Sequence, residues 1–154
     1  MTARGSSDSL GQVTSDASSA DDHATPVEGI TLLVVDSEIA SARALIRLLR
    51  DDGFTVELAT DGGLAIARLS RDPLPRVLIS DLHLPGADGT AVANYARSRN
   101  PKMHVVFVTA RPELARKHTL DPSAVVFKKP VEYQALHTHL LLVTGQPPSS
   151  RKPR

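Results

Sequence analysis

Four polar side chains that could do chemistry together stand at the ends of short apolar runs of the chain. Asp36 and Asp81 each follow such a run, and two carboxylates brought to one place form a site for a hard cation such as Mg²⁺, which prefers oxygen ligands. Thr109 and Lys129 follow two later runs. A hydroxyl and an ammonium opposite the carboxylates would hold a phosphoryl group, the threonine as a hydrogen-bond donor and the lysine as a point charge. The set therefore indicates phosphoryl chemistry assisted by a divalent cation.

The runs that carry these residues have the length and composition of buried strands. Each is short and rich in Val, Ile, Leu or Phe, as expected for a parallel sheet that is covered on both faces. The five predicted strands are 30–35, 55–59, 76–80, 104–108 and 124–128. In a parallel sheet of this kind, functional groups gather at the carboxyl ends of the strands. The four side chains are thus predicted to lie along one edge of the sheet.

Segments with the apolar spacing of helices separate the strands. Three of them cover residues 39–49, 64–69 and 91–96. Pro112 begins a short fourth helix, which Asp121 and Pro122 must end, and a fifth covers 132–143 and stops at Gly145. The alternation of strand and helix predicts one three-layer α/β domain with right-handed crossovers.

Length and composition exclude several classes of protein. A chain of 154 residues has room for about one domain, and no apolar run exceeds four residues, far below the roughly 20 that cross a bilayer. Without a secretory signal or a cysteine, the chain is expected in the cytoplasm, with neither disulfides nor thiolate metal sites. Aromatic residues make up 3% and Trp is absent, which excludes a stacking platform for single-stranded nucleic acid.

The two ends differ in composition from the middle. Residues 1–29 hold five acidic residues against one arginine, a charge of −4, and are rich in Ser and Thr, which predicts a disordered arm. Residues 145–154 are Pro-rich with a charge of +3, which predicts an extended basic tail. The folded part is then 30–144, and its charge of +2 is too small to indicate a nucleic-acid-binding face.

Four short motifs, in this order, resemble the bacterial response-regulator receiver domain over residues 30–144. They are LLVVD at 32–36, DLHLPGADG at 81–89, VTA at 108–110 and KKP at 128–130. The resemblance implies a doubly wound, flavodoxin-like (βα)5 fold with strand order 2-1-3-4-5. It also implies that Asp81 accepts a phosphoryl group from a sensor histidine kinase, a phosphotransfer protein or a small phosphodonor, and becomes an acyl phosphate.

The same resemblance implies roles for the residues around Asp81. Thr109 would be drawn toward the new phosphate, and Lys129 would pair with it. Mg²⁺ would be held by Asp36, Asp81 and the backbone carbonyl of His83. Phosphorylation would add a charge of about −1.5 to −2 at the end of one strand, which is enough to reposition neighbouring donors and to act as a switch.

Two positions depart from the family pattern. The family has two adjacent acidic residues after the first strand, whereas this chain reads Asp36-Ser37, so one metal ligand is missing and weak Mg²⁺ binding is expected. Glu38 either faces away at the start of the first helix or reaches back to supply a carboxylate. In the last strand the family usually carries Tyr or Phe where this chain has Val126, and alternation sends Phe127 to the opposite face.

Two functions remain open for this pattern. One is a single-domain response regulator, a phosphoacceptor switch in a two-component phosphorelay and not itself an enzyme. The other is a pseudo-receiver, the same fold used as an interaction module independent of phosphorylation. Because no further domain is recognised after residue 144, output to an unidentified downstream protein is expected through the receiver surface or the arms. A flavodoxin-type enzyme is disfavoured, since the loop after the first strand lacks glycine and carries acidic residues that repel phosphate.

Other residues are expected to have structural roles. Asp88 is predicted to cap the third helix. His137 and His139 are two residues apart on one helix, so they lie on different faces and do not share a metal. The run 140–143 covers more than one helix face, so part of it is expected to be exposed. The run is either a partner or dimer surface or simply packs on the side of the last strand.

Overall fold

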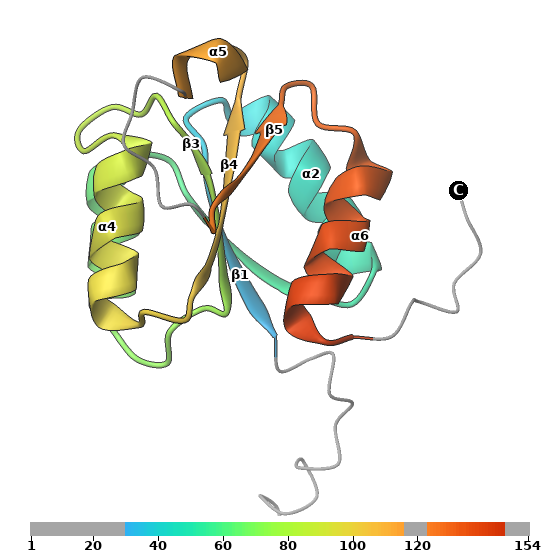
Figure 1. Ribbon diagram of the computed structural model, residues 1–154, viewed down its shortest axis with the longest axis horizontal. Helices are drawn as coiled ribbons and strands as arrows, with labels where there is room; N and C mark the ends of the chain where they lie inside the picture. The colour runs from blue at the N-terminus through green and yellow to red at the C-terminus, as the bar shows by residue number, and fades with distance from the viewer. Residues whose placement is uncertain (1–29, 116–122, 147–154) are drawn as a thin grey trace, which may run out of the picture.

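A five-stranded parallel sheet in the order β2-β1-β3-β4-β5 forms the centre of the molecule (Figure 1). The computed structural model describes residues 30–115 and 123–146. The strands are β1 (Thr31–Val35), β2 (Thr55–Ala59), β3 (Val77–Asp81), β4 (His104–Thr109) and β5 (Val125–Lys128). The predicted fold class and strand order are confirmed, and each predicted strand end is within one residue of the observed one.

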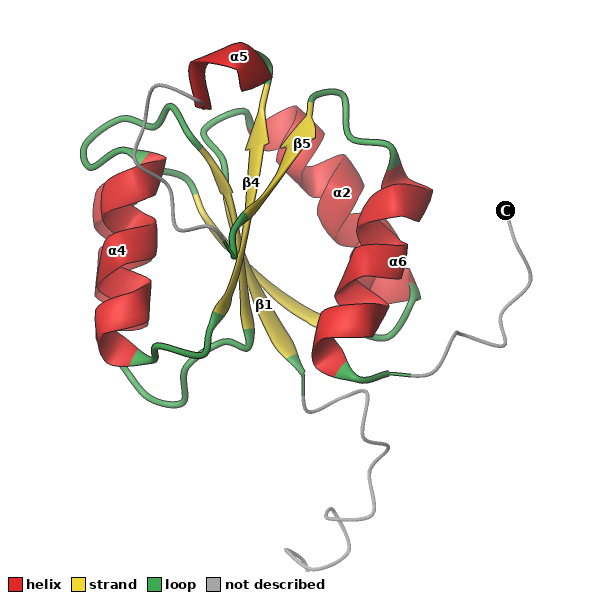
Figure 2. Cartoon of the chain, viewed as in Figure 1, coloured by secondary structure: helices red, strands yellow, loops and turns green. Residues whose placement is uncertain are grey.

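Helices cover both faces of this sheet (Figure 2). α2 (Ile39–Asp51) and α6 (Tyr133–Thr144) lie on one face, and α3 (Gly62–Leu69) and α4 (Gly89–Arg99) lie on the other. The short α5 (Pro112–Ala115) follows the carboxyl end of β4. The predicted end of this fourth helix, at Asp121 and Pro122, lies outside the described residues.

Strand β1 shows why its apolar run is continuous. Leu32 and Val34 pack in the cluster with α2 and α6, whereas Leu33 and Val35 pack with α3 and α4. All four residues are at most 2% exposed. Both faces of β1 are therefore buried. Because neither face meets water, the strand is apolar at every one of these positions.

Polar caps set the helix ends, which apolar spacing alone misplaces. α4 begins at Gly89, two residues before the predicted start, because the carboxylate of Asp88 accepts a hydrogen bond from the backbone N–H of Ala91. α3 begins early in the same way, behind Asp61. α6 stops at Gly145, whose φ of 72° is in the left-handed region that favours glycine. The predicted caps at Asp88 and Gly145 are confirmed.

Helix α6 turns different residues to different surroundings. Leu140 is fully buried and Leu142 is 76% exposed, so the prediction that part of the run 140–143 is exposed is confirmed. His137 stacks on the ring of Tyr133, whereas His139 lies against β5. The two histidines therefore lie on different faces, as their spacing predicted.

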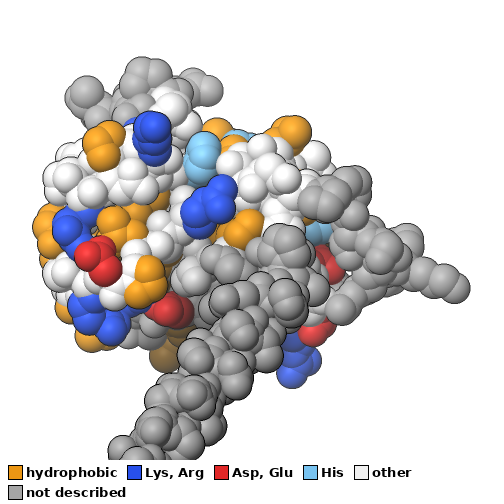
Figure 3. All heavy atoms as spheres, turned by 90° about the horizontal axis from the view of Figure 1, so that it is seen from below, with side chains coloured by type: hydrophobic (Ala, Val, Ile, Leu, Met, Phe, Trp, Pro, Cys, Tyr) orange, Lys and Arg blue, Asp and Glu red, His pale blue; other side chains and the backbone are white. Residues whose placement is uncertain are grey.

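The predicted arms lie almost entirely outside the described residues and stay predictions. Gln146 is described, and its backbone N–H donates to the carbonyl of Leu141 at 3.1 Å, which completes the end of α6. In the part of the chain that the structure describes, no helix combines the length and the apolar character needed to span a membrane. On the visible part of the face in Figure 3, Lys and Arg side chains are interspersed with Asp and Glu.

Candidate functional site

The register of the strands brings the predicted site residues to one edge of the sheet. Val35 of β1 is paired with Ser80 of β3, so the next residues, Asp36 and Asp81, come side by side. Asp81 is in turn paired with Val108 of β4, which immediately precedes Thr109. Because the strands are parallel, their carboxyl ends all meet at this edge.

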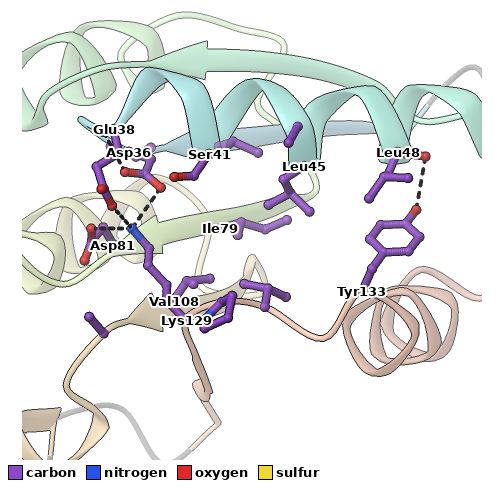
Figure 4. A pocket seen from close by; sticks show the side chains of 16 residues that line it. Asp36, Glu38, Ser41, Leu45, Leu48, Ile79, Asp81, Val108, Lys129 and Tyr133 are labelled. Atoms are coloured by element: carbon purple, nitrogen blue, oxygen red, sulfur yellow. Dashed lines mark hydrogen bonds and ion pairs between the residues drawn. The ribbon is translucent and has the colours of Figure 1, made fainter.

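The ammonium of Lys129 joins three carboxylates at this edge (Figure 4). Its Nζ donates to Asp81 Oδ2 at 2.9 Å, to Asp36 Oδ2 at 3.0 Å and to Glu38 Oε1 at 3.3 Å. The side chains of Lys129, Asp36 and Asp81 are only 11–14% exposed, whereas that of Glu38 is 67% exposed. Two of the three contacts are therefore shielded from water, and the third lies at the rim.

Main-chain hydrogen bonds orient the two shielded carboxylates. Asp36 Oδ1 accepts from the backbone N–H of Glu38 at 2.9 Å, and Asp81 Oδ1 accepts from that of His83 at 3.2 Å. Each aspartate thus uses one oxygen on its own loop and turns the other toward Lys129. Both Oδ2 atoms therefore face the same ammonium.

Lys129 is positioned by the neighbouring strand. Its backbone N–H donates to the carbonyl of Thr109 at 2.9 Å, and its peptide bond to Pro130 is cis. Burial favours the neutral amine, but the hydrogen bonds and charges of Asp81 and Asp36 outweigh it and raise the pKa of Lys129 above its ordinary value. The side chain is therefore a fixed cation at neutral pH.

Thr109 is fully buried beside this cluster. Its Oγ1 accepts a hydrogen bond from the backbone N–H of Arg111 at 3.1 Å, so the side chain turns toward the loop that follows its own strand. The structure therefore places this hydroxyl at the same edge of the sheet as the acids.

Gly89 is a site residue that apolar spacing and charge did not reveal. A Cβ at this position would lie 2.2 Å from the backbone oxygen of Asp81 and 2.9 Å from Cα of Leu82, so α4 approaches the end of β3 more closely than any side chain here would allow. The Gly89 N–H also donates to the Leu82 carbonyl at 2.9 Å. The sequence analysis used this region only to place the start of a helix, capped by Asp88. A glycine in the first turn of a helix is also a sign that another backbone segment lies close to it.

The two positions that depart from the family pattern, Ser37 and Val126, lie in different surroundings. Ser37 is exposed, and Glu38, at the start of α2, reaches back as far as the ammonium of Lys129. A role of Glu38 as a metal ligand stays a prediction. In β5, Phe127 packs on the side of α2 and α6, and Val126 packs on the side of α3 and α4. The predicted alternation of these two residues is confirmed, and the position that usually holds an aromatic ring is filled by valine.

The donor set is suited to Mg²⁺ but small. Among the described residues there is no group of three or more His, Cys, Asp and Glu side chains arranged to hold a metal. Two convergent carboxylates remain, Asp36 and Asp81, and Mg²⁺ is commonly bound by one or two carboxylates together with water and phosphate oxygens. Asp36 and Asp81 can therefore bind Mg²⁺. The site has one carboxylate fewer than it would have with an acid at position 37.

Comparison with known proteins assigns the chain to a family. The family model of the response regulator receiver domain matches residues 32–141. The chain belongs to this family. Domains of this kind are generally signalling modules rather than enzymes, and they generally bind Mg²⁺ at the acidic pocket.

Curated relatives and solved structures agree with this assignment. The chain is 38% identical over 82 residues to the probable transcriptional regulatory protein TcrX of Mycobacterium tuberculosis, and 41% over 81 residues to the sensory transduction protein RegX3 of Mycobacterium bovis. Each match covers 53% of this chain but 35% of the relative, so the chain spans about a third of their length.

Among solved structures, a response regulator receiver protein from Sinorhizobium medicae matches with a TM-score of 0.68 and 26% identity, over 75% of this chain and 94% of that one. The chemotaxis response regulator CheY4 of Vibrio cholerae matches with a TM-score of 0.66 and 25% identity, over 74% of this chain and 98% of that one. Nearly the whole length of each solved domain therefore has a counterpart here.

Proposed function

We propose that this receiver domain is a phosphoacceptor switch in a two-component phosphorelay and that Asp81 takes the phosphoryl group. The observation that carries the proposal is the pair of contacts from Lys129 Nζ to Asp81 at 2.9 Å and to Asp36 at 3.0 Å. A fixed cation between two shielded carboxylates stabilises negative charge where a phosphoryl group would arrive. Phosphoryl transfer asks a protein mainly for such positioning and charge stabilisation.

In the proposed step, one carboxylate oxygen of Asp81 attacks the phosphorus of a phosphohistidine on a sensor kinase or a phosphotransfer protein. The P–N bond of the donor breaks as the new P–O bond forms, and the electron pair of the broken bond stays on the imidazole nitrogen. Asp81 then carries an acyl phosphate. Lys129 pairs with a phosphate oxygen, and the Thr109 hydroxyl leaves its contact with Arg111 to donate to another.

Asp36, Asp81 and the backbone carbonyl of His83 would hold Mg²⁺ in this step. The cation neutralises charge that otherwise repels the incoming phosphoryl group. Glu38, which already reaches Lys129 at 3.3 Å, is the carboxylate that could add to this set at the exposed rim. With Ser37 in place of an acid, we expect the affinity for Mg²⁺ to be low.

One observation favours the pseudo-receiver as a second candidate. The ammonium of Lys129 already binds both shielded carboxylates, and Ser37 supplies no further carboxylate that would help Mg²⁺ compete with it. If Mg²⁺ does not compete with this internal cation, the domain would keep one conformation and act through its surface alone.

Labelling with acetyl phosphate and Mg²⁺, read as intact mass, separates these functions. The wild-type chain should gain the mass of one phosphoryl group, and Asp81→Asn should gain none. Asp88→Asn is the matched control, because Asn also caps helices well and the residue lies outside the cluster. Labelling of Asp81→Asn would disprove the assignment, and a folded wild-type chain that takes no phosphate would favour the pseudo-receiver.

A further inference from the structure

A hollow continues from the acidic cluster into the layer between α2 and the β5–α6 loop (Figure 4). Its volume is about 440 Å³, within the range of pockets that bind small molecules. Val34, Ile79 and Val108 form its floor on the sheet, and Leu45 and Leu48 of α2 form one wall. The hollow is thus mostly apolar, although its mouth is charged.

Small side chains and one hydrogen bond keep this hollow open. Ser41 and Ala44 are the residues of α2 that face it beside the two leucines, and neither is long enough to cross to the loop. At the far end, the Tyr133 hydroxyl donates to the Asp52 carboxylate at 2.7 Å and lies 3.2 Å from the Leu48 carbonyl, so it joins α6 to the end of α2. The floor is almost fully buried, but Leu45 and Leu48 are only partly buried, so apolar surface of the wall is left for a ligand to cover.

The charges at the mouth of the hollow determine which charge a ligand bound there would carry. Asp36, Glu38 and Asp81 line the mouth together with a single cation, Lys129, so the cluster has a formal charge of −2. Two of these carboxylates are only 11% and 13% exposed, and water screens them poorly. As long as no divalent cation is bound, an anionic ligand would be repelled there and a cationic one attracted.

We propose that this hollow binds a small organic cation, with its apolar body between α2 and the β5–α6 loop and its ammonium at the acidic mouth. Such a ligand would use the carboxylates that the phosphoryl transfer needs and would compete with Mg²⁺. The expected slowing of Asp81 phosphorylation by such a ligand rests on the function proposed above. The binding itself does not.

The test uses three probes of matched shape: phenethylamine, phenethyl alcohol and phenylpropionate. Titration of the wild-type chain, followed by backbone amide NMR shifts without phosphodonor, should show shifts at the hollow. We expect the amine to bind at least about fivefold more tightly than the carboxylate, with the alcohol between them. Equal affinity for the three probes, or preference for the carboxylate, would overturn the proposed cation.

Two variants test the two parts of the site. Ala44→Leu fills the hollow and should weaken the amine and the alcohol alike, whereas Ala67→Leu, also on an exposed helix position, should leave both unchanged. Glu38→Gln should weaken the amine and not the alcohol. If Ala44→Leu, still folded by its NMR spectrum, binds the amine as tightly as the wild type, the hollow is not the site.

A last measurement couples the ligand to the switch. Saturating phenethylamine should slow acetyl-phosphate labelling of the wild type severalfold, and added Mg²⁺ should restore it. Labelling without amine tests the phosphoacceptor by itself, and binding without phosphodonor tests the hollow by itself. Amine binding that leaves the labelling rate unchanged would disprove the competition.

Discussion

The ammonium of Lys129 donates a hydrogen bond to the carboxylate of Asp81 over 2.9 Å, although 48 positions separate the two residues in the chain. The same ammonium reaches Asp36 at 3.0 Å. One cation therefore compensates two acids that the sheet register places side by side. Stability and the proposed chemistry depend on the same contact, so that stability measurements report on the site.

Lys129→Met should lower the free energy of unfolding by about 1–3 kcal/mol at neutral pH without divalent cation. It leaves two carboxylates, 11% and 13% exposed, without their shared donor, while the methionine keeps most of the apolar stem. Urea unfolding measures the loss. Lys128→Met removes a neighbouring exposed charge and should change stability by less than about 0.5 kcal/mol. Equal losses in both variants would contradict the role of the cluster.

The pH dependence of this contribution follows from the direction of the pKa shift. The pKa of Lys129 is raised above its ordinary value of 10.5, because the bonds to Asp81 and Asp36 outweigh the effect of burial. A raised pKa means that the contribution is complete below the unfolded value and is lost as the pH rises through the folded one. The stability difference between wild type and Lys129→Met should therefore stay constant from about pH 7 to 9 and shrink only above about pH 10.

Gly89→Ala should destabilise the domain by at least about 2 kcal/mol. The added Cβ would lie 2.2 Å from the Asp81 backbone oxygen, and neither α4 nor the end of β3 can yield without moving the site. Gly63→Ala is the matched control. The nearest atom to its Cβ would be the Asp61 carboxylate oxygen at 3.4 Å, so alanine should be neutral or slightly stabilising there. Similar unfolding midpoints for the two variants would contradict the close approach.

The fold could be predicted because its signals are local. The predicted strand ends lie within one residue of the ends of β1 to β5, and the caps at Asp88 and Gly145 mark helix limits without long-range information. The strand order came from the family resemblance, since periodicity alone does not choose which strands pair. Helix starts at glycine were missed because glycine carries no apolar side chain to count.

The site could be predicted only as a set of residue types at strand ends. The sequence indicates that Asp36, Asp81 and Lys129 meet, but it does not indicate that one ammonium binds both acids. Glu38 had two possible orientations, because a side chain of its length can point either way at a helix start. Gly89 was missed as a site residue because its effect depends on a backbone distance between two elements.

Deletion of residues 1–28 and 147–154 should leave the thermal unfolding midpoint within about 2 °C of the wild-type value. Neither segment has enough apolar residues to contribute to a core. The cut is placed after Gln146, since its backbone N–H donates to the Leu141 carbonyl and belongs to the end of α6. Loss of cooperative unfolding in the shortened chain would show that one of the segments packs on the domain.

Ser37→Asp should lower stability without Mg²⁺ and increase the stabilisation that Mg²⁺ provides. The new carboxylate adds repulsion beside Asp36 and Asp81 when no metal is bound, and it adds a ligand when one is. Thermal unfolding with and without Mg²⁺ measures both effects, because a ligand that binds only the native state raises stability with its concentration. Ser98→Asp, on α4, introduces the same charge away from the cluster and should not alter the response to Mg²⁺.

The wild-type response to Mg²⁺ in the same experiment decides between the two functions. A stabilisation confined to Ser37→Asp would mean that Lys129 keeps the cation out of the natural site, which favours the pseudo-receiver. Equal stabilisation of both proteins would mean that another group already supplies the ligand, which favours the switch. In that case Glu38→Gln should reduce the wild-type response, because Glu38 is the remaining carboxylate that reaches Lys129. An unchanged response in Glu38→Gln would leave Asp36 and Asp81 as sufficient ligands and would contradict a role of Glu38 in binding Mg²⁺.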